Sequence, residues 1–159
     1  GEGNLRQELT ASLALEILAG RSSPFYKRLY DEGLINSGFS AAYEYTAGVA
    51  YTLAGGESSD PEKVFEQYKK EVDRLIENGP DAKHFARQKK AMLGRQISSL
   101  NSFESICLNL SRGYFRNYDA FEAPRLLGEI TTTDVTAYMK QNMSPDNMAL
   151  CAIRPTKNV

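Results

Sequence analysis

His84 is the first residue to consider for acid–base or metal chemistry, because it is the only histidine among the 159 residues. It lies near the start of a charged helical stretch, "KHFARQKK", next to Lys83. A zinc site of the usual kind draws several His, Cys or carboxylate ligands, and no second histidine can join this one. The sequence therefore predicts a solvent-exposed His84 on a helix surface and no metal-binding residue.

Cys107 and Cys151 are the candidate nucleophiles. A catalytic cysteine needs a base that a third group orients, and the chain offers only His84 for that role. The two cysteines follow no CxxC or metal-like spacing, and each lies in an apolar stretch where a thiol behaves as a small hydrophobic group. We expect two buried free thiols and no catalytic residue.

Phosphate and nucleic-acid sites are equally poorly supported. The glycine-containing stretches "LAGR" and "AGGES" lack the Lys-Ser/Thr of a P-loop, so turn chemistry explains them. A basic cluster formed by Lys83, Arg87, Lys89 and Lys90 follows an acidic stretch, and 19 basic against 20 acidic residues leave a net charge of −1. This balance argues against nucleic acid and favours a solvated helix face.

The bulk composition, with 42% hydrophobic and 25% charged residues, is that of a globular domain. No apolar run approaches the roughly 20 residues that a membrane helix needs, so we expect a soluble chain. We also expect residues 1–159 to form a single domain.

Two helices open the chain. In "NLRQELTASLALEILAGRSS" apolar residues recur at every fourth position, which predicts an amphipathic helix. The stretch of residues 22–33 then carries a capping Ser22 or Ser23, Pro24 in its first turn and Gly33 at its end. Its predicted apolar side is Phe25, Tyr26, Leu29 and Tyr30.

Strand periodicity begins at residue 35 and predicts an antiparallel hairpin over residues 35–54. Large apolar residues alternate in both halves, at Phe39, Ala41, Tyr43 and Tyr45 and again at Val49, Tyr51 and Leu53. The intervening small residues, Ala42, Ala50, Thr52 and Ala54, predict a shallow second face that suits closely packed helices. The apolar run "NMALCAIRP" predicts a further, buried strand at residues 147–155.

Four more helical stretches lie between these strands. The best marked begins at Asp60-Pro61 and ends at Gly79-Pro80, with Val72 in its apolar stripe. A long helical region follows from Asp81, with a possible bend at Gly94 or Ser98-Ser99, and shorter helices are predicted near residues 120–127 and after a capping Thr132 or Thr133. This grouping predicts an α+β fold: two layers, with an antiparallel sheet and helices packed mainly on one face.

The order and wording of these parts resemble one known family. The relevant stretches are "SSPFYKRLYDEGLINSGFSAAYEY", "NGPDAKHFARQKKAMLGRQ" and "ITTTDVTAYMKQNMSPDNMAL", which together span nearly the whole chain. They resemble the second, non-catalytic half-module of the pitrilysin/insulinase-like zinc peptidases, the inverzincins. Because modules of that family begin with strand sequence ahead of the first helix, the resemblance implies that this chain is an N-terminally truncated half-module.

The resemblance also implies a function. In that family a zinc-bearing module with an H-x-x-E-H helix closes on a non-catalytic module around a peptide substrate, and this chain has no H-x-x-E-H. It would therefore form the wall of the chamber opposite zinc, with no activity or cofactor of its own, as part of a zinc-dependent metalloendopeptidase. The alternative is a structural or interaction subunit of the same fold, like the core proteins of respiratory complexes.

Substrate-binding residues are not transferred from the family. In that family, active pairs of modules often carry an arginine near the end of the helix that corresponds to residues 22–33 and a tyrosine just after "GL". In this chain Tyr30 and Asn36 stand near those positions. The partners that the resemblance implies are a homologous zinc-bearing module, in the same chain or another subunit, and a peptide, without nucleic acid or membrane. For the parent protein we expect a bacterial, cytoplasmic source. A strand missing from the sheet would leave an exposed edge, through which the chain could form a homo-oligomer.

Overall fold

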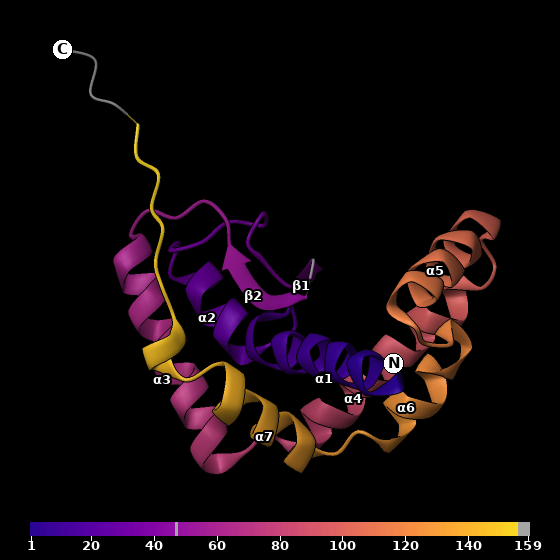
Figure 1. Cartoon of the computed structure of the whole chain (residues 1–159). Coiled ribbons are helices and arrows are strands. Elements are labelled where there is room, and N and C mark those ends of the chain that lie inside the picture. Colours follow the sequence, from indigo (N-terminus) through magenta and orange to yellow (C-terminus); the bar gives the residue numbers. More distant parts are fainter. Residues whose placement is uncertain (47, 156–159) are drawn as a thin grey trace.

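The fold is organised around its first helix, α1 (Glu2–Ala19), in a computed structural model that describes residues 1–46 and 48–155. The predicted stripe of Leu5, Leu9, Leu13 and Ile17 is buried, and so are Ala11, Ala14, Leu15 and Leu18 on other sides of the helix. A helix that is apolar on most sides must be enclosed. Accordingly α1 packs against the hairpin and the helices α2, α3, α4, α6 and α7, and the elements form an open crescent (Figure 1).

Helix α2 (Pro24–Asp31) follows the predicted punctuation. The Ser23 hydroxyl accepts a hydrogen bond from the backbone N–H of Tyr26 at 3.0 Å, and Gly33 takes a positive φ of 67° just beyond the helix. Phe25 and Leu29 are fully buried, whereas Tyr30 is 50% exposed and stacks on Tyr26. The helix therefore has the predicted ends but a narrower buried side.

The hairpin consists of β1 (Ser40–Thr46) and β2 (Val49–Gly55), paired antiparallel with Tyr43 opposite Thr52. The grouping of its side chains into faces was predicted wrongly. A two-residue turn pairs Thr46 with Val49, so odd-numbered residues of β1 share a face with even-numbered residues of β2. Tyr43 thus lies over the helices with Thr52, and the large apolar residues of β2 lie on the opposite face.

Three long helices follow, α3 (Pro61–Asn78), α4 (Ala82–Ser99) and α5 (Phe103–Arg116). Asp60, Asp81 and Ser102 cap their N-termini with side-chain oxygens. The sequence predicted a bend at Gly94 or at Ser98-Ser99 in the long helical region after Asp81. The structure instead divides this region into two helices at residues 100–102, directly after Ser98-Ser99. In Figure 1 α5 forms the far arm of the crescent, opposite α3.

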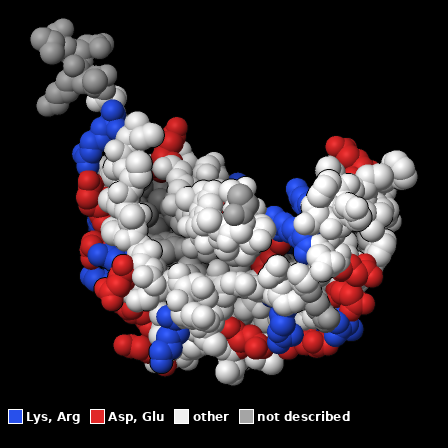
Figure 2. Space-filling model, in the orientation of Figure 1, with Lys and Arg blue, Asp and Glu red and all other residues white. Residues whose placement is uncertain are grey.

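The chain closes with a 3₁₀ turn (Ala120–Glu122), α6 (Ala123–Glu129), α7 (Thr132–Asn142) and a second 3₁₀ turn (Pro145–Asn147). The N-cap of α7 is Thr131, one residue before the predicted caps, because its hydroxyl and the carboxylate of Asp134 form a reciprocal capping box. Charged side chains gather along the outer edge of the crescent, and little charge lies on the face shown in Figure 2.

The prediction of a strand at residues 147–155 is wrong. Residues 148–155, which we call the tail segment, are extended but belong to no sheet, and among the residues described β1 and β2 form a two-stranded sheet. A strand needs a hydrogen-bonded neighbour, and the tail segment lies apart from β2. The α+β class is nevertheless the one predicted, with helices packed on one face of the hairpin.

Core substitutions test this packing. Leu29→Ala should lower the free energy of unfolding by about 2–5 kcal/mol through lost burial and a residual cavity, and Val72→Ala should lower it by less. Both side chains are fully buried. Ile97→Ala, at a side chain that is mostly exposed, is the matched control and should stay within about 0.5 kcal/mol of the parent in chemical denaturation. A parent-like midpoint for Leu29→Ala would contradict the assigned buried face.

The capping box of α7 predicts a pH-dependent contribution to stability. The hydrogen bond from the Thr131 hydroxyl, with help from Arg6, lowers the pKa of Asp134 below its ordinary value. A depressed folded-state pKa contributes stability above the unfolded pKa, and this contribution is lost as the pH falls through the folded pKa. Asp134→Asn should therefore cost up to about 1 kcal/mol at pH 7, and the difference from the parent should shrink below about pH 4. Asp73→Asn, at an exposed position within α3, should show no such convergence in urea titrations at the two pH values.

Candidate functional site

His84 is buried, with 7% of its surface exposed, so the predicted surface histidine is wrong. Its backbone N–H donates to the N-cap Asp81, which fixes the residue in the first turn of α4, and Phe85 and Gln88 of the same helix are also buried. The imidazole Nδ1 lies 3.2 Å from the guanidinium of Arg87, and Nε2 has no hydrogen-bond partner. No group of three or more metal-ligating side chains occurs in the part of the chain that the structure describes.

Both cysteines are exposed, which contradicts their predicted burial. Apolar neighbours in sequence indicated burial, but α5 and the tail segment, which carry Cys107 and Cys151, contribute little to the core. The structure brings neither thiol to a base. It does place Cys151 beside a cavity, described below.

Tyr30 and Asn36, the residues near the family's substrate-binding positions, both lie beside Tyr26. Asn36 organises its own turn: its side-chain oxygen accepts from the N–H of Gly38 at 2.8 Å, and its amide donates to Glu57 at 2.6 Å. Tyr30 stacks on Tyr26, whose hydroxyl lies 3.5 Å from the Asn36 carbonyl oxygen. The side-chain oxygen of Asn36 is thus occupied by its own turn, and its amide by Glu57.

The first feature that the sequence prediction missed is an open sheet face. We give this name to the side of the hairpin formed by Ala42, Glu44, Val49, Tyr51 and Leu53. Its three large apolar side chains are 60%, 45% and 55% exposed at Val49, Tyr51 and Leu53. The available signal was the number of residues between the two strands, because the pairing of Thr46 with Val49 fixes which residues of β2 share a face with Tyr43.

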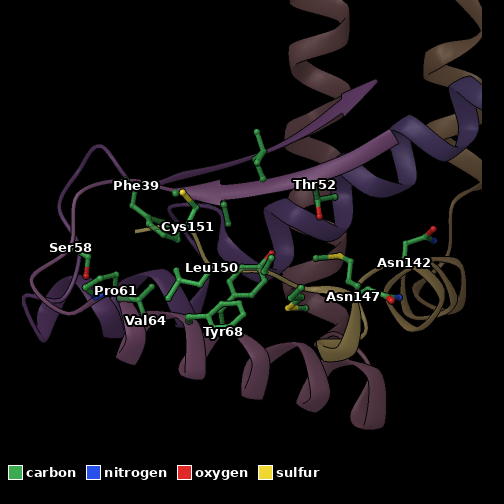
Figure 3. A pocket seen from close by; sticks show the side chains of 18 residues that line it. Phe39, Thr52, Ser58, Pro61, Val64, Tyr68, Asn142, Asn147, Leu150 and Cys151 are labelled. Carbon is green, nitrogen blue, oxygen red and sulfur yellow. The ribbon is translucent and has the colours of Figure 1, made fainter. Parts of the chain in front are cut away.

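The second missed feature is a cavity of about 360 Å³ along the edge of β2 that faces away from β1 (Figure 3). We call it the lateral groove. It is bounded by β2 with the residues just after it, the helix α3 and residues 147–151, and Phe39 and the end of α7 at Asn142 and Met143 also line it. In Figure 3, Val64 and Tyr68 lie on α3 in the lower part of the view. Leu150 and Cys151 of the tail segment lie above them, toward the hairpin. The space-filling view is hollowed at the same place, between the hairpin and the tail segment (Figure 2).

Three tyrosines in or near this region have raised pKa values. Burial raises the pKa of Tyr68, and it raises the pKa of Tyr138 to about 12. Burial likewise raises the pKa of Tyr43, on the helix side of the hairpin. These phenols therefore stay protonated and neutral near pH 7, and Tyr68 is the one of the three that lines the lateral groove.

A polar cluster ties the far arm of the crescent to the hairpin. Arg116 donates to the carboxylate of Glu8 at 2.6 Å and to the carbonyl oxygen of Tyr45 at 3.2 Å, with its guanidinium carbon 4.7 Å from the Tyr45 ring centroid. The amino group of Gly1 donates to the Arg116 carbonyl at 3.2 Å. The start of α1, the end of α5 and the turn end of the hairpin are thus held together.

With this geometry in hand, comparison with known proteins identifies the family. The model of the peptidase M16 inactive domain matches residues 2–92, more than half of the chain. The chain belongs to the peptidase M16 family. This confirms the pitrilysin/insulinase-like resemblance and the non-catalytic type of the domain. It also agrees with the missing H-x-x-E-H and the lack of a metal-ligating cluster among the residues described.

Individual M16 relatives agree with this assignment. YmfH of Bacillus subtilis (strain 168), named an uncharacterized zinc protease, is 30% identical over 156 residues, covering 98% of this chain and 36% of that protein. A solved structure assigned as an M16-like peptidase from Alicyclobacillus acidocaldarius gives a TM-score of 0.87 at 28% identity, covering 92% of this chain and 36% of that one. The chain thus spans little more than one third of the length of these relatives.

More distant structures share the fold. A protease from Helicobacter pylori gives a TM-score of 0.74 at 13% identity, covering 87% of this chain and 35% of that one. A chain assigned as a zinc protease from Bordetella pertussis Tohama I gives 0.67 at 16% identity, covering 89% of this chain and 81% of that one. In the described part of this M16 chain, no helix is long and apolar enough to cross a membrane.

The solitary His84 predicts that the isolated chain binds no zinc tightly, because a closed tetrahedral site needs further ligands. Metal analysis after dialysis should find no stoichiometric zinc, and melting temperatures in zinc and in EDTA should agree. His84→Leu is the matched variant. It should keep that agreement, and its effect on stability is the sum of two opposing changes: loss of the contact between Nδ1 and Arg87, and removal of the buried Nε2 that has no partner. A zinc-dependent rise in melting temperature that disappears in His84→Leu would overturn this reading.

Proposed function

We propose that this domain forms the zinc-free wall of a peptide-binding chamber and pairs with a homologous zinc-bearing module. Membership of the M16 inactive-domain family supports a non-catalytic role. The observation that carries the finer proposal is the open sheet face, where Val49, Tyr51 and Leu53 are exposed on a side that none of the described helices covers. Exposed apolar side chains that lie together on one surface commonly mark the site of a partner protein or a ligand.

The chemistry available on this face is contact rather than catalysis. The phenol and the aliphatic side chains can shield a bound peptide from water and pack against its apolar groups, while Glu44 supplies one negative charge. The zinc of the partner module would supply the activated water for hydrolysis. The residues of this domain would hold the peptide against that module, so their contribution appears in substrate binding.

The test uses the complex of this domain with its zinc-bearing module and follows hydrolysis of an apolar peptide. Tyr51→Ser combined with Leu53→Ser should raise KM by about three- to tenfold with kcat within about twofold, because uniform binding is lost. Thermal melts should match the parent, since both side chains are about half exposed. Ile97→Ser, an exposed apolar position on α4, should leave KM unchanged.

Two results would reject the proposal. An unchanged KM in the double variant would remove the open sheet face from the chamber. A zinc-loaded complex that hydrolyses no peptide, together with an upstream module lacking H-x-x-E-H, would instead support the alternative of a structural or interaction subunit.

A further inference from the structure

Helix α5 presents apolar side chains to solvent along one side. We call this side the α5 face and define it by Phe103, Cys107, Leu108, Leu110, Tyr114 and Phe115. Phe103, Tyr114 and Phe115 are 83%, 82% and 84% exposed, and Cys107 is exposed as well. Exposed aromatic residues that gather on one surface mark an interaction site.

The opposite side of α5 is anchored, so the orientation of the α5 face is fixed. Gly113 is buried against the backbone of Tyr118, where an added Cβ would lie 2.6 Å from the carbonyl oxygen. The 3₁₀ turn at residues 120–122 packs against α5 beside Ile106, and Arg116 bonds to Glu8. Figure 1 shows α5 at one end of the crescent, where a second molecule can approach it.

The row within this face has the spacing of helices that pair. Phe103, Cys107, Leu110 and Tyr114 follow one another at intervals of four, three and four residues. This alternation is that of the positions that two packed helices turn toward each other in a coiled coil. The natural occupant of the α5 face is therefore another helix with the same spacing.

We propose that the α5 face is a homodimer interface, at which α5 of one copy packs antiparallel against α5 of a second copy. The row is self-complementary, because an aromatic residue stands at each end and smaller residues stand between them. A two-fold axis through its middle sets Phe103 of one copy against Tyr114 of the other, and Cys107 against Leu110. This inference does not depend on the proposed function.

The charges of α5 favour the antiparallel arrangement. Glu104 lies in the first turn of the helix, and Arg112 lies near its end. Two antiparallel copies place the acidic beginning of one helix beside the basic end of the other, and they also oppose the helix dipoles. A parallel pair would bring like charges together, so self-pairing selects one orientation.

The exposed area is sufficient for a weak dimer. An aromatic side chain covers about 150–250 Å², so the three aromatic residues with Leu108 and Leu110 present roughly 500–700 Å² per copy. Two copies would bury about 1,000–1,400 Å² in total, which reaches the lower limit of specific interfaces. We therefore expect a dissociation constant in the micromolar range.

A membrane surface is a poorer occupant. Helices that lie on membranes usually carry several Lys or Arg on their polar side. Helix α5 contains no lysine and two arginines, of which Arg116 is already paired with Glu8.

The first test measures the mass of the 159-residue chain by sedimentation and light scattering from about 1 to 100 μM. The parent should pass from monomer to dimer. Phe103→Glu combined with Tyr114→Glu should weaken the dimer at least tenfold, because it places carboxylates in the contact. Its melting temperature at the lowest concentration should match that of the parent, since both side chains are more than 80% exposed. Leu53→Glu, on the open sheet face, is the matched control and should leave the dimer intact.

The second test uses the two cysteines as reporters. The axes of packed helices lie about 8–10 Å apart, so a short bismaleimide should link two Cys151→Ser molecules through Cys107. Cys107→Ser molecules, which keep the exposed Cys151 on the tail segment, should not be linked. The same Cys107 link should form in the complex with the zinc-bearing module.

Four results would overturn the proposal. A chain that stays monomeric at every concentration would remove the interface, and association beyond two copies would exclude a closed two-fold pair. A dimer that survives the double variant but is lost in Leu53→Glu would assign self-association to the sheet. A complex in which Cys107 is shielded from thiol reagents without any dimer would assign the α5 face to the zinc-bearing module.

Discussion

Enclosure of α1 is the constraint on which the rest of the structure depends. A helix with Leu9 and Leu13 buried on one side and Leu15 and Leu18 buried on others cannot lie on a surface, so the hairpin and helices such as α4, α6 and α7 must surround it. This requirement also fixes which face of the hairpin is covered. The other face is left open because all the helices that could cover it are committed to α1 or to one another.

Helices were predictable because their information is local. The cap at Ser23, the cap at Asp60 with Pro61 after it, and the glycines that follow can be read within a few residues of each helix end. The fold class followed from the order of these elements. The hairpin itself was predictable. Which side chains of its two strands share a face depends on how many residues separate the strands, and an error of one residue moves every side chain of one strand to the other face.

The remaining features could not be predicted because they depend on distant parts of the chain. His84 is buried by the packing of the first turn of α4, although its neighbours in sequence are charged. The run "NMALCAIRP" has the composition of a buried strand, yet a strand exists only where a neighbour supplies the hydrogen bonds. The exposure of Cys107 and Cys151 has the same origin, since apolar sequence indicates a capacity for burial and not the presence of a covering element.

The lateral groove and the open sheet face differ in what they can recognise. The lateral groove presents backbone N–H and C=O groups along β2, which any extended strand can satisfy in a fixed register. The open sheet face presents side chains alone, because the backbone groups of β1 and β2 lie in the plane of the sheet. Contacts of Tyr51 and Leu53 with a peptide would be non-directional and tolerant of sequence. A peptide held there would therefore need its register set by the zinc-bearing module, so the wall can contribute affinity while the position of cleavage is chosen elsewhere.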